Sequence, residues 1–265
     1  MPLGLSLGAF RPTYVSTVAA YENTKSLSLD GTDAIAVLDA NKLQTLLRDS
    51  FTYSFWYYDT SLATSDFAGF EIATGTAQNF RLRYLPVAPG VSFIILQFKA
   101  NNNGPQHVIS QFLSSNTWHH IAVTVQKRSG ANSANMKLYV NGSSVGSTFA
   151  GPPGTHQELF AATSTLRWGV GAVWTDDGAA DFSGYTSGNF DEVAFWSRAL
   201  SAGAISTIYN SGTSIDLTEN SGSYNDSDSL EFYYRFEDDY TDTMGVGADA
   251  YVQGAPTFAS SPTPP

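Results

Sequence analysis

The sequence lacks cysteine, long apolar runs and a large share of charged residues. None of its 265 residues is cysteine, so disulfide bonds and a cysteine nucleophile are excluded. It has no run of about 20 apolar residues, so no transmembrane helix is predicted. The first residues have no basic region followed by an apolar core, so a secretion signal is not expected. These absences favour a protein that stays in the cytoplasm or is assembled into a particle there.

The few charged residues are mainly acidic. Charged side chains make up 14% of the chain, and the formal net charge is −11. Nucleic acids and anionic membrane surfaces would repel such a chain, so neither is expected as a partner. The length is sufficient for one large β domain with a core that needs no crosslinks.

The clearest structural pattern lies between residues 116 and 146. Apolar and polar residues alternate over 119–126, as in a strand with one face in a core. A second alternating run, 136–141, ends at Asn141-Gly142, which favours a type I′ hairpin turn because both residues tolerate positive φ. The order strand, loop, strand and tight turn predicts an all-β sandwich or barrel.

Other segments predict further strands and one short helix. Residues 51–58 are aromatic and β-branched, and residues 190–196 are apolar on both faces, as in the centre of a sheet. Ser201 is placed to cap a short helix that ends at Gly212.

The remaining segments predict loops and termini. Residues 174–188 are rich in Asp, Gly and Ser and predict a long loop. Residues from 256 onward are rich in Pro and Ser and are expected to pack poorly. We therefore expect an N-terminal arm (1–24), which is either a flexible leader or a segment that docks on a partner, one β-sandwich (25–253) and a Pro/Ser-rich tail (254–265).

Five motifs occur in an informative order along the chain. They are SLSLDG at 26–31, FTYSFW at 51–56, WHHIAVT at 118–124, LYVNG at 138–142 and FDEVAFWSRALS at 190–201. Together they resemble the concanavalin A-like lectin/glucanase superfamily, specifically its laminin-G-like and pentraxin-like branch. The resemblance implies an all-β, antiparallel two-sheet jelly roll with one short helix. Members of this superfamily bind glycans, proteins or lipids, and some hydrolyse polysaccharides.

The phrase Asn23-Thr24-Lys25-Ser26-Leu27 opens the expected domain. It resembles the start of laminin-G-like domains in structural proteins of tailed bacteriophages. That resemblance implies a virion protein, either a capsid decoration or a tail or fibre component, assembled in the host cytoplasm. Its partners would be other virion proteins or copies of itself, and a cell-surface glycan would be a further partner.

Catalytic carboxylates are the first chemistry to consider. Retaining glucanases of the resembled superfamily carry two glutamates around an aspartate on one strand, with carboxyl groups about 5 Å apart. This sequence has no Glu-x-Asp-x-Glu or Glu-x-Asp-x-x-Glu run. In the clusters Asp191-Glu192 and Glu237-Asp238-Asp239, adjacent residues on a strand would point to opposite faces. His119-His120 indicates neither a catalytic triad nor a zinc site. We therefore expect no enzymatic activity.

Calcium is the cofactor that the resemblance suggests, because pentraxin-like and laminin-G-like domains often bind it. Calcium takes six to eight oxygen ligands. The candidates are Asp30 and Asp33 in the first turn, Asp176, Asp177 and Asp181 in the long loop, and Asn225, Asp226 and Asp228. None of these groups has a ligand spacing that marks it as the calcium site. Asp and Asn in turns also commonly cap the backbone, which is the alternative role for these residues.

Asp191 is a different kind of candidate. Period 2 places it on the face of Val193 and Phe195, where its carboxylate would be buried. An unpaired buried carboxylate is costly, so Asp191 should accept several hydrogen bonds, pair with a cation or coordinate a metal. Its alternative roles are therefore to lock a neighbouring loop or to serve as a metal ligand.

Aromatic residues make up 14% of the chain, and most are expected in the core. Trp174 and Tyr185 are the better candidates for a sugar-stacking platform because they flank a loop rich in Asp and Gly. Asp176 and Asp177 in that loop complete the predicted carbohydrate site.

Two functions follow from these features. The first is a non-enzymatic virion structural or decoration protein, with glycan adhesion at its loops. The alternative is a stand-alone, calcium-assisted carbohydrate-binding module with a concave aromatic groove.

Overall fold

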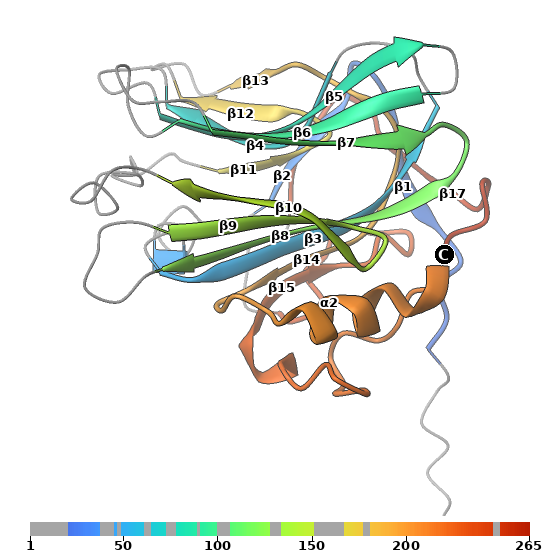
Figure 1. Ribbon diagram of the computed structural model, residues 1–265. Helices are drawn as coiled ribbons and strands as arrows, with labels where there is room; N and C mark the ends of the chain where they lie inside the picture. The colour runs from blue at the N-terminus through green and yellow to red at the C-terminus, as the bar shows by residue number, and fades with distance from the viewer. Residues whose placement is uncertain are drawn as a thin grey trace, which may run out of the picture.

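The computed structural model describes residues 21–37, 45–46, 49–60, 65–72, 78–88, 91–99, 107–127, 134–150, 167–176, 181–245 and 250–265. They form two β-sheets that face one another, with one short α-helix below the first sheet (Figure 1). The strand pairings among them are antiparallel, apart from β12 with β4. The predicted antiparallel two-sheet β-sandwich is confirmed.

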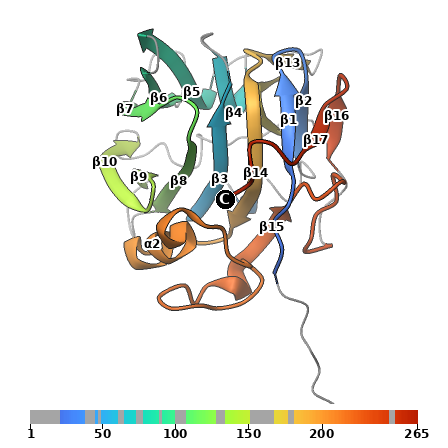
Figure 2. The same cartoon turned by 90° about the vertical axis from the view of Figure 1, so that its right-hand side faces the viewer.

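The first sheet has β14 near its centre, between β3 and β1 (Figure 2). Its order is β10 (Ser143–Ala150), β9 (Ala134–Val140), β8 (Trp118–Lys127), β3 (Phe51–Asp59), β14 (Ser187–Trp196), β1 (Ser26–Asp30) and β17 (Thr257–Ala259), and β15 (Leu230–Tyr234) also pairs with β14. β9 and β10 are joined at Asn141 (φ 50°) and Gly142 (φ 74°). Positive φ at both residues is type I′ geometry, so the predicted hairpin is confirmed.

The second sheet lies above the first in Figure 1. Its order is β16 (Tyr251–Gln253), β2 (Ala34–Val37), β11 (Trp168–Val170), β4 (Ser65–Ile72), β5 (Gln78–Ala88), β6 (Val91–Lys99) and β7 (His107–Ser114). In addition, β12 (Val173–Asp176) pairs with β4, and β13 (Asp181–Ser183) pairs with β12.

Helix α2 (Ala202–Tyr209) covers the outer face of the first sheet. Ser201 Oγ accepts a hydrogen bond from Ala204 N (3.0 Å), so the predicted N-cap is confirmed. The left-handed residue Asn210 ends the helix and begins the 3-10 turn η1 (Asn210–Gly212), and a second such turn is η2 (Ser227–Ser229). No helix among the described residues is long and apolar enough to span a membrane.

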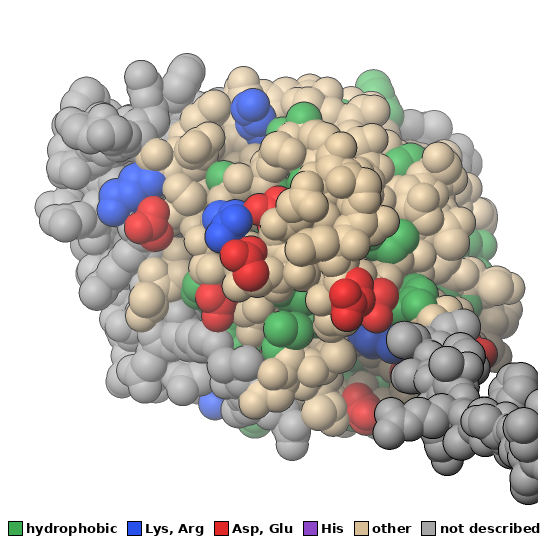
Figure 3. Space-filling view, turned by 90° about the horizontal axis from the view of Figure 1, so that it is seen from below, with side chains coloured by type: hydrophobic (Ala, Val, Ile, Leu, Met, Phe, Trp, Pro, Cys, Tyr) green, Lys and Arg blue, Asp and Glu red, His purple; other side chains and the backbone are tan. Residues whose placement is uncertain are grey.

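The surface on the α2 side carries acidic side chains beside basic ones (Figure 3). There Arg198 forms ion pairs with Asp226 (3.0 Å) and Asp228 (3.5 Å). These two aspartates, which the sequence marks as calcium candidates, are therefore partly neutralised by a protein cation.

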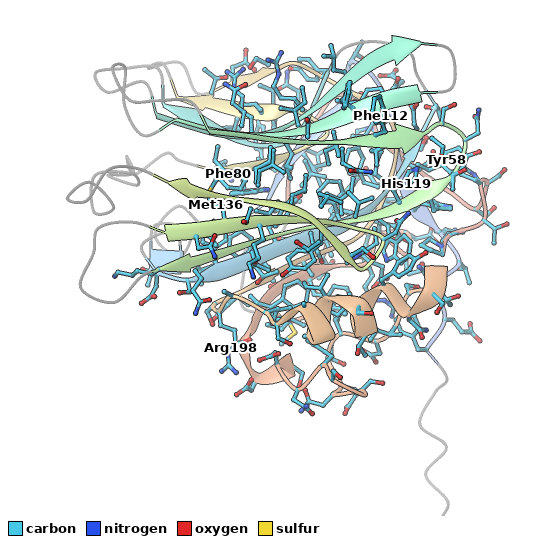
Figure 4. All side chains as sticks on the ribbon, in the orientation of Figure 1. Tyr58, Phe80, Phe112, His119, Met136 and Arg198 are labelled. Atoms are coloured by element: carbon cyan, nitrogen blue, oxygen red, sulfur yellow. The ribbon has the colours of Figure 1, made fainter. Side chains whose placement is uncertain are left out.

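Side chains from both sheets fill the space between them. The Trp168 ring is fully buried there, and its centroid lies 4.7 Å from that of Tyr53, 5.1 Å from Phe80 and 5.4 Å from Phe195. Figure 4 shows Phe80 and Met136 reaching into this space from opposite sheets. Because Trp168 and Phe80 belong to the second sheet and Tyr53 and Phe195 to the first, these rings tie the layers together.

Three short strands occur at positions where the sequence predicts no strand. β13 lies inside the expected loop 174–188, β16 lies at the end of the expected sandwich and β17 lies inside the expected tail. β17 pairs with β1, and Thr263 accepts a hydrogen bond from Trp118 Nε1 (2.8 Å). The expectation that the tail packs poorly is therefore wrong. Of the expected arm, residues 21–24 lie on the sandwich, and residues 1–20 lie outside the described residues.

Candidate functional site

The outer face of β2 is a floor of small side chains. Ala34 and Ala36 pack in a cluster on this face, whereas Ile35 points into the core between the sheets. Gly169 of β11 and Tyr251 of β16 flank Ala36 in register. Because the floor residues are small, aromatic side chains from other segments can pack on them.

β12 and β13 place two aromatic rings on this floor. Trp174 and Phe182 are directly paired between the strands, and their ring centroids lie 5.1 Å apart at 90°. Both side chains are buried, with 4% and 6% of their surface exposed, and they pack with Ala34 and Ala36. They form the base of an aromatic cluster.

Tyr185 and Tyr251 extend this cluster to the surface. The Tyr251 ring lies 6.3 Å from Phe182 and 6.0 Å from Trp174, and 48% of Tyr251 is exposed. The Tyr185 ring lies 6.3 Å from Phe182, and its hydroxyl accepts a hydrogen bond from Gln253 Nε2 (2.8 Å). We define the aromatic patch as Arg167, Trp174, Phe182, Tyr185, Tyr251 and Gln253.

The polar groups of the aromatic patch stand beside its exposed rings. Partial burial, with the negative charge of Asp181 nearby, raises the pKa of Tyr185, so its hydroxyl stays protonated at neutral pH. Since that hydroxyl accepts from Gln253, its own hydrogen can be donated to a ligand. An exposed ring with a hydroxyl and an amide at its edge can hold a cyclic, polar molecule.

The aromatic patch contains two of the four residues predicted to bind sugar. Trp174 and Tyr185 both pack against Phe182, although Trp174 is covered and supports the exposed rings from below. Asp176 ends β12, but its side chain lies outside the described residues, as does all of Asp177. Their part in binding stays a prediction.

No pattern in the sequence identifies Arg167, Tyr251 and Gln253 as residues of the site. Arg167 immediately precedes β11, and the other two lie on a three-residue strand near the end of the chain. They reach the aromatic patch only because β11 and β16 both pair with β2. No local signal in the sequence shows that pairing.

Asp30 and Asp33, predicted as calcium ligands, accept hydrogen bonds from backbone and side-chain groups of the protein. Asp30 Oδ1 accepts hydrogen bonds from Thr32 Oγ1 (2.7 Å) and Thr32 N (2.8 Å), which hold the pKa of Asp30 below its ordinary value. Asp33 Oδ1 accepts from Ala255 N (2.8 Å), which fastens the segment before β17.

A calcium ion needs several oxygen ligands that converge on one point. Within the part of the chain that the structure describes, no three acidic or histidine side chains gather in this way. Those residues alone do not fit the ion, and the calcium site stays a prediction.

Asp191 is fully buried, as predicted, but on the other side of the sheet. β14 carries a β-bulge between Asp191 and Ala194 in its pairing with β3. Asp191 is paired with Trp56, whose ring faces α2, whereas Val193 and Phe195 pack between the sheets. The bulge reverses the alternation, so the predicted shared face with Val193 and Phe195 is wrong.

The bulge residue Glu192 and its neighbour Asp191 form a buried acid pair. Glu192 has φ 51° and only 2% of its surface exposed. β1 pairs with β14 up to Phe190, and β15 pairs with it from Val193, so β1 and β15 lie end to end along one edge of β14 (Figure 2). The segment before β1 and the segment after β15 therefore meet at the acid pair.

Asn23 holds Asp191 from the segment before β1. Its Nδ2 donates to Asp191 Oδ2 (2.8 Å), and also to Ser214 Oγ (2.9 Å) and the Pro265 carbonyl oxygen (3.2 Å). Asp191 Oδ1 accepts from Glu192 N (2.9 Å). Both carboxylate oxygens of Asp191 are thus bonded to protein donors, which matches a loop-locking role.

Glu192 is held from the side of β15. The Tyr233 hydroxyl donates to its carboxylate, and Arg235 Nε lies 3.6 Å from Oε1. Burial raises the pKa of Glu192 to about 7 in spite of these two partners. Burial, followed by the charge of Glu192, raises the pKa of Asp191 well above its ordinary value.

The bulge also places both acids of the pair on one side of the sheet. Asp191 and Glu192 both lie on the α2 side, so the expectation that they point to opposite faces is wrong. Their exposed fractions are 0% and 2%, so a polysaccharide does not reach them in this conformation. The acid pair is a structural junction here.

A family model with the description concanavalin A-like lectin/glucanases superfamily matches residues 29–206. A comparison with curated proteins returns no match.

Solved structures share the fold at low sequence identity. A protein of Bacteroides ovatus, assigned as carbohydrate-binding, aligns with a TM-score of 0.57 and 17% identity over 90% of this chain; the chain spans 60% of that protein's length. The CBM40 module of a Ruminococcus gnavus sialidase, bound to α2,3 sialyllactose, aligns with a TM-score of 0.50 and 10% identity over 70% of this chain and 97% of the module. Tailspike protein 2 of bacteriophage CBA120 aligns at 0.42 and 14% identity, over 70% of this chain and 26% of the tailspike. The tailspike similarity is too weak to bear on function.

Proposed function

The chain belongs to the concanavalin A-like lectin/glucanase superfamily, as the order of its motifs predicts, and from this premise we propose that it is a non-enzymatic glycan-binding protein. The observation that carries the proposal is the aromatic patch on the second sheet. There the exposed ring of Tyr251 stands beside the hydroxyl of Tyr185 and the amide of Gln253.

The chemistry of sugars fits this arrangement. A sugar ring presents C–H groups on its faces and hydroxyl groups at its edge, so it can stack on an aromatic ring and hydrogen-bond to polar groups beside that ring. Trp174 and Phe182 pack against the Tyr251 ring and restrict its motion before a ligand binds. Tyr251 therefore loses less conformational entropy on binding. The assigned and observed carbohydrate binding of the two structural relatives supports the proposal.

The position of the carboxylates supports binding without hydrolysis. A glycosidase needs two carboxyl groups that reach the scissile bond. The adjacent acids Asp191 and Glu192 are closed off under Asn23, Tyr233 and Arg235 instead.

We expect Tyr251→Ala to weaken glycan binding by at least about 10-fold, which corresponds to about 1.4 kcal/mol. The substitution removes the exposed stacking face and leaves the buried base of the patch in place. A glycan array, followed by calorimetry on the strongest ligand, measures the effect.

Phe112→Ala is the matched control for this experiment. Phe112 is 56% exposed on β7 (Figure 4), and its ring centroid lies 4.0 Å from that of Phe93. β7 and β16 lie at the two ends of the second sheet, so Phe112 lies away from Tyr251. Its removal is expected to leave glycan binding unchanged. Equal losses in both variants, or no loss with Tyr251→Ala, would contradict the assignment of the site.

Membership of a phage particle is a second proposal. It is supported by the phrase at residues 23–27, and part of that phrase is fastened to the domain, since the Glu237 carboxylate accepts hydrogen bonds from Thr24 N (2.7 Å) and Lys25 N (3.1 Å). In this proposal the protein is a decoration, tail or fibre component that contacts other virion proteins or its own copies. Mass spectrometry of purified particles tests it, and absence of the protein from them would reject it.

Glycan binding that depends on a bound calcium ion is the alternative to binding by the aromatic patch alone. Measuring glycan binding before and after EDTA treatment distinguishes these two alternatives. Loss of binding, restored by added calcium, would support a calcium-assisted module, and unchanged binding would support recognition by the aromatic patch alone.

A further inference from the structure

Arg167 is the cation of the aromatic patch. Its guanidinium carbon lies 5.6 Å from the Trp174 ring centroid and 5.5 Å from that of Tyr251, close enough for cation–π attraction to both rings. The Arg167 side chain is partly exposed. It takes part in none of the ion pairs or hydrogen bonds formed between described residues.

Other basic residues of the described chain are used differently. Lys25, Arg198 and Arg235 each pair with at least one carboxylate. In a chain with a net charge of −11, the Arg167 guanidinium is held by two aromatic rings and by no described carboxylate. It keeps its charge and its donors for a ligand.

The shape of the guanidinium specifies that ligand. Arginine offers five N–H donors in a planar fork, which matches the two oxygens of a carboxylate, and stacking on a ring leaves the edge of the fork open. The guanidinium lies over the Tyr251 ring, and 48% of Tyr251 is exposed, which leaves part of this side chain open for contact with a sugar.

We propose that the aromatic patch binds a glycan that carries a carboxylate, such as a uronic acid, and that Arg167 receives this carboxylate. The inference rests on the proposed glycan-binding function and adds the class of sugar. Asp181 is exposed beside Tyr185 and would repel the carboxylate, which directs it toward Arg167. One sugar ring would thus stack on Tyr251 with its acid group on Arg167 and its hydroxyl groups near Tyr185 and Gln253.

The test compares trigalacturonic acid with its methyl ester, which keeps the shape of the sugar and removes the charge. We expect the wild-type protein to bind the acid about 10- to 100-fold more tightly than the ester, as for a hydrogen-bonded charged pair. A second pair of probes, sialyllactose and lactose, should show the same preference if the carboxylate alone decides.

Two substitutions isolate the role of Arg167. Arg167→Gln keeps much of the length and removes the charge, so the preference for acid over ester should disappear while the ester binds as before. Arg167→Lys keeps the charge without the planar fork, so an intermediate preference is expected. Tyr251→Ala should weaken acid and ester alike, because both stack on the same ring.

The outcomes separate this inference from the proposed function. If the wild-type protein binds acid and ester equally, or Arg167→Gln keeps the preference, the carboxylate assignment is wrong while glycan binding stands. If sulfated and carboxylated sugars bind equally well, the patch recognises anionic sugars in general and the restriction to carboxylates is overturned. If no glycan binds, both proposals are rejected.

Discussion

Glu192→Gln is expected to remove the Glu192 share of a loss of stability that the wild-type protein undergoes as the pH rises from about 4.5 to about 7. The ordinary pKa of this group is 4.5, and burial raises it to about 7 in the folded state. Below pH 4.5 the carboxyl group is protonated in both states and costs nothing. Between the two values the unfolded chain releases the proton and the folded chain retains it, so the free energy of unfolding falls as pH rises, by about 3 kcal/mol in total. Above pH 7 no further loss is expected from this group.

The neighbours of Glu192 explain why the effect belongs to this position. From β14 it faces the carboxyl group of Asp191, and from the β15 side it faces Arg235, the Tyr233 hydroxyl and the more distant Glu237. Tyr21, from the segment before β1, adds a further hydroxyl. Arg235 is the arginine at this junction, and it lies near the carboxyl groups of several acidic residues. The negative charge of an ionised Glu192 is therefore poorly compensated.

Urea unfolding at pH 4, 5.5, 7 and 8 measures the effect as a difference between variants, which cancels the titrating groups that do not interact with Glu192. Asp191, whose pKa the charge of Glu192 raises, contributes to the measured difference. Glu192→Gln should match the wild type at pH 4 and exceed it by about 3 kcal/mol at pH 8. Glu219→Gln, at an exposed glutamate, is the control and should run parallel to the wild type. Parallel curves for Glu192→Gln would show that the acid pair is not buried as described.

Trp168→Ala is expected to reduce the free energy of unfolding by about 3 to 5 kcal/mol, the usual cost of removing a large core aromatic. The Trp168 ring is fully buried and contacts Tyr53 and Phe195 of the first sheet as well as Phe80 of its own. Its loss leaves a cavity where the two layers meet, and the rings around it can close that cavity only in part.

Chemical unfolding of Trp168→Ala, followed by circular dichroism, measures this cost. Phe112→Ala serves again as the control, because an exposed side chain away from the core should change stability by no more than about 0.5 kcal/mol. A cost below about 1 kcal/mol for Trp168→Ala would mean that the sheets do not pack through this ring.

Features encoded by neighbouring residues could be predicted from the sequence. Asn141-Gly142 sets its own backbone geometry, and Ser201 caps the helix that follows it within three residues. The alternation along β8 places Ile121 and Val123 in the core. In each case the determining contacts are local, so the pattern and the structure agree.

Features that depend on distant pairing could not be predicted. β13, β16 and β17 have three residues each, too few for an alternating pattern, and they form only because a partner strand is present. The bulge at Glu192 adds one residue to β14 without any sign in its apolar run, so period 2 assigned Asp191 to the wrong face.

The candidate site also combines residues marked by a local pattern with residues that only distant strand pairing brings together. Membership of an Asp/Gly-rich loop marked Trp174 and Tyr185 as candidates, and both contact Phe182, although Trp174 is buried and their role in sugar binding stays a prediction. Arg167 and Tyr251 were not marked in this way, because their proximity depends on β11 and β16 pairing with opposite edges of β2. The patch therefore combines one local signal with one that only the sheet order provides.

Hydrogen–deuterium exchange of the full chain, with and without the glycan that gives the strongest array signal, tests the central claim most directly. If glycans bind the aromatic patch, slowed exchange will be confined to residues 167–176, 181–185 and 250–253. Slowed exchange on β5 to β7 or around α2 instead, with the patch unchanged, would contradict the account.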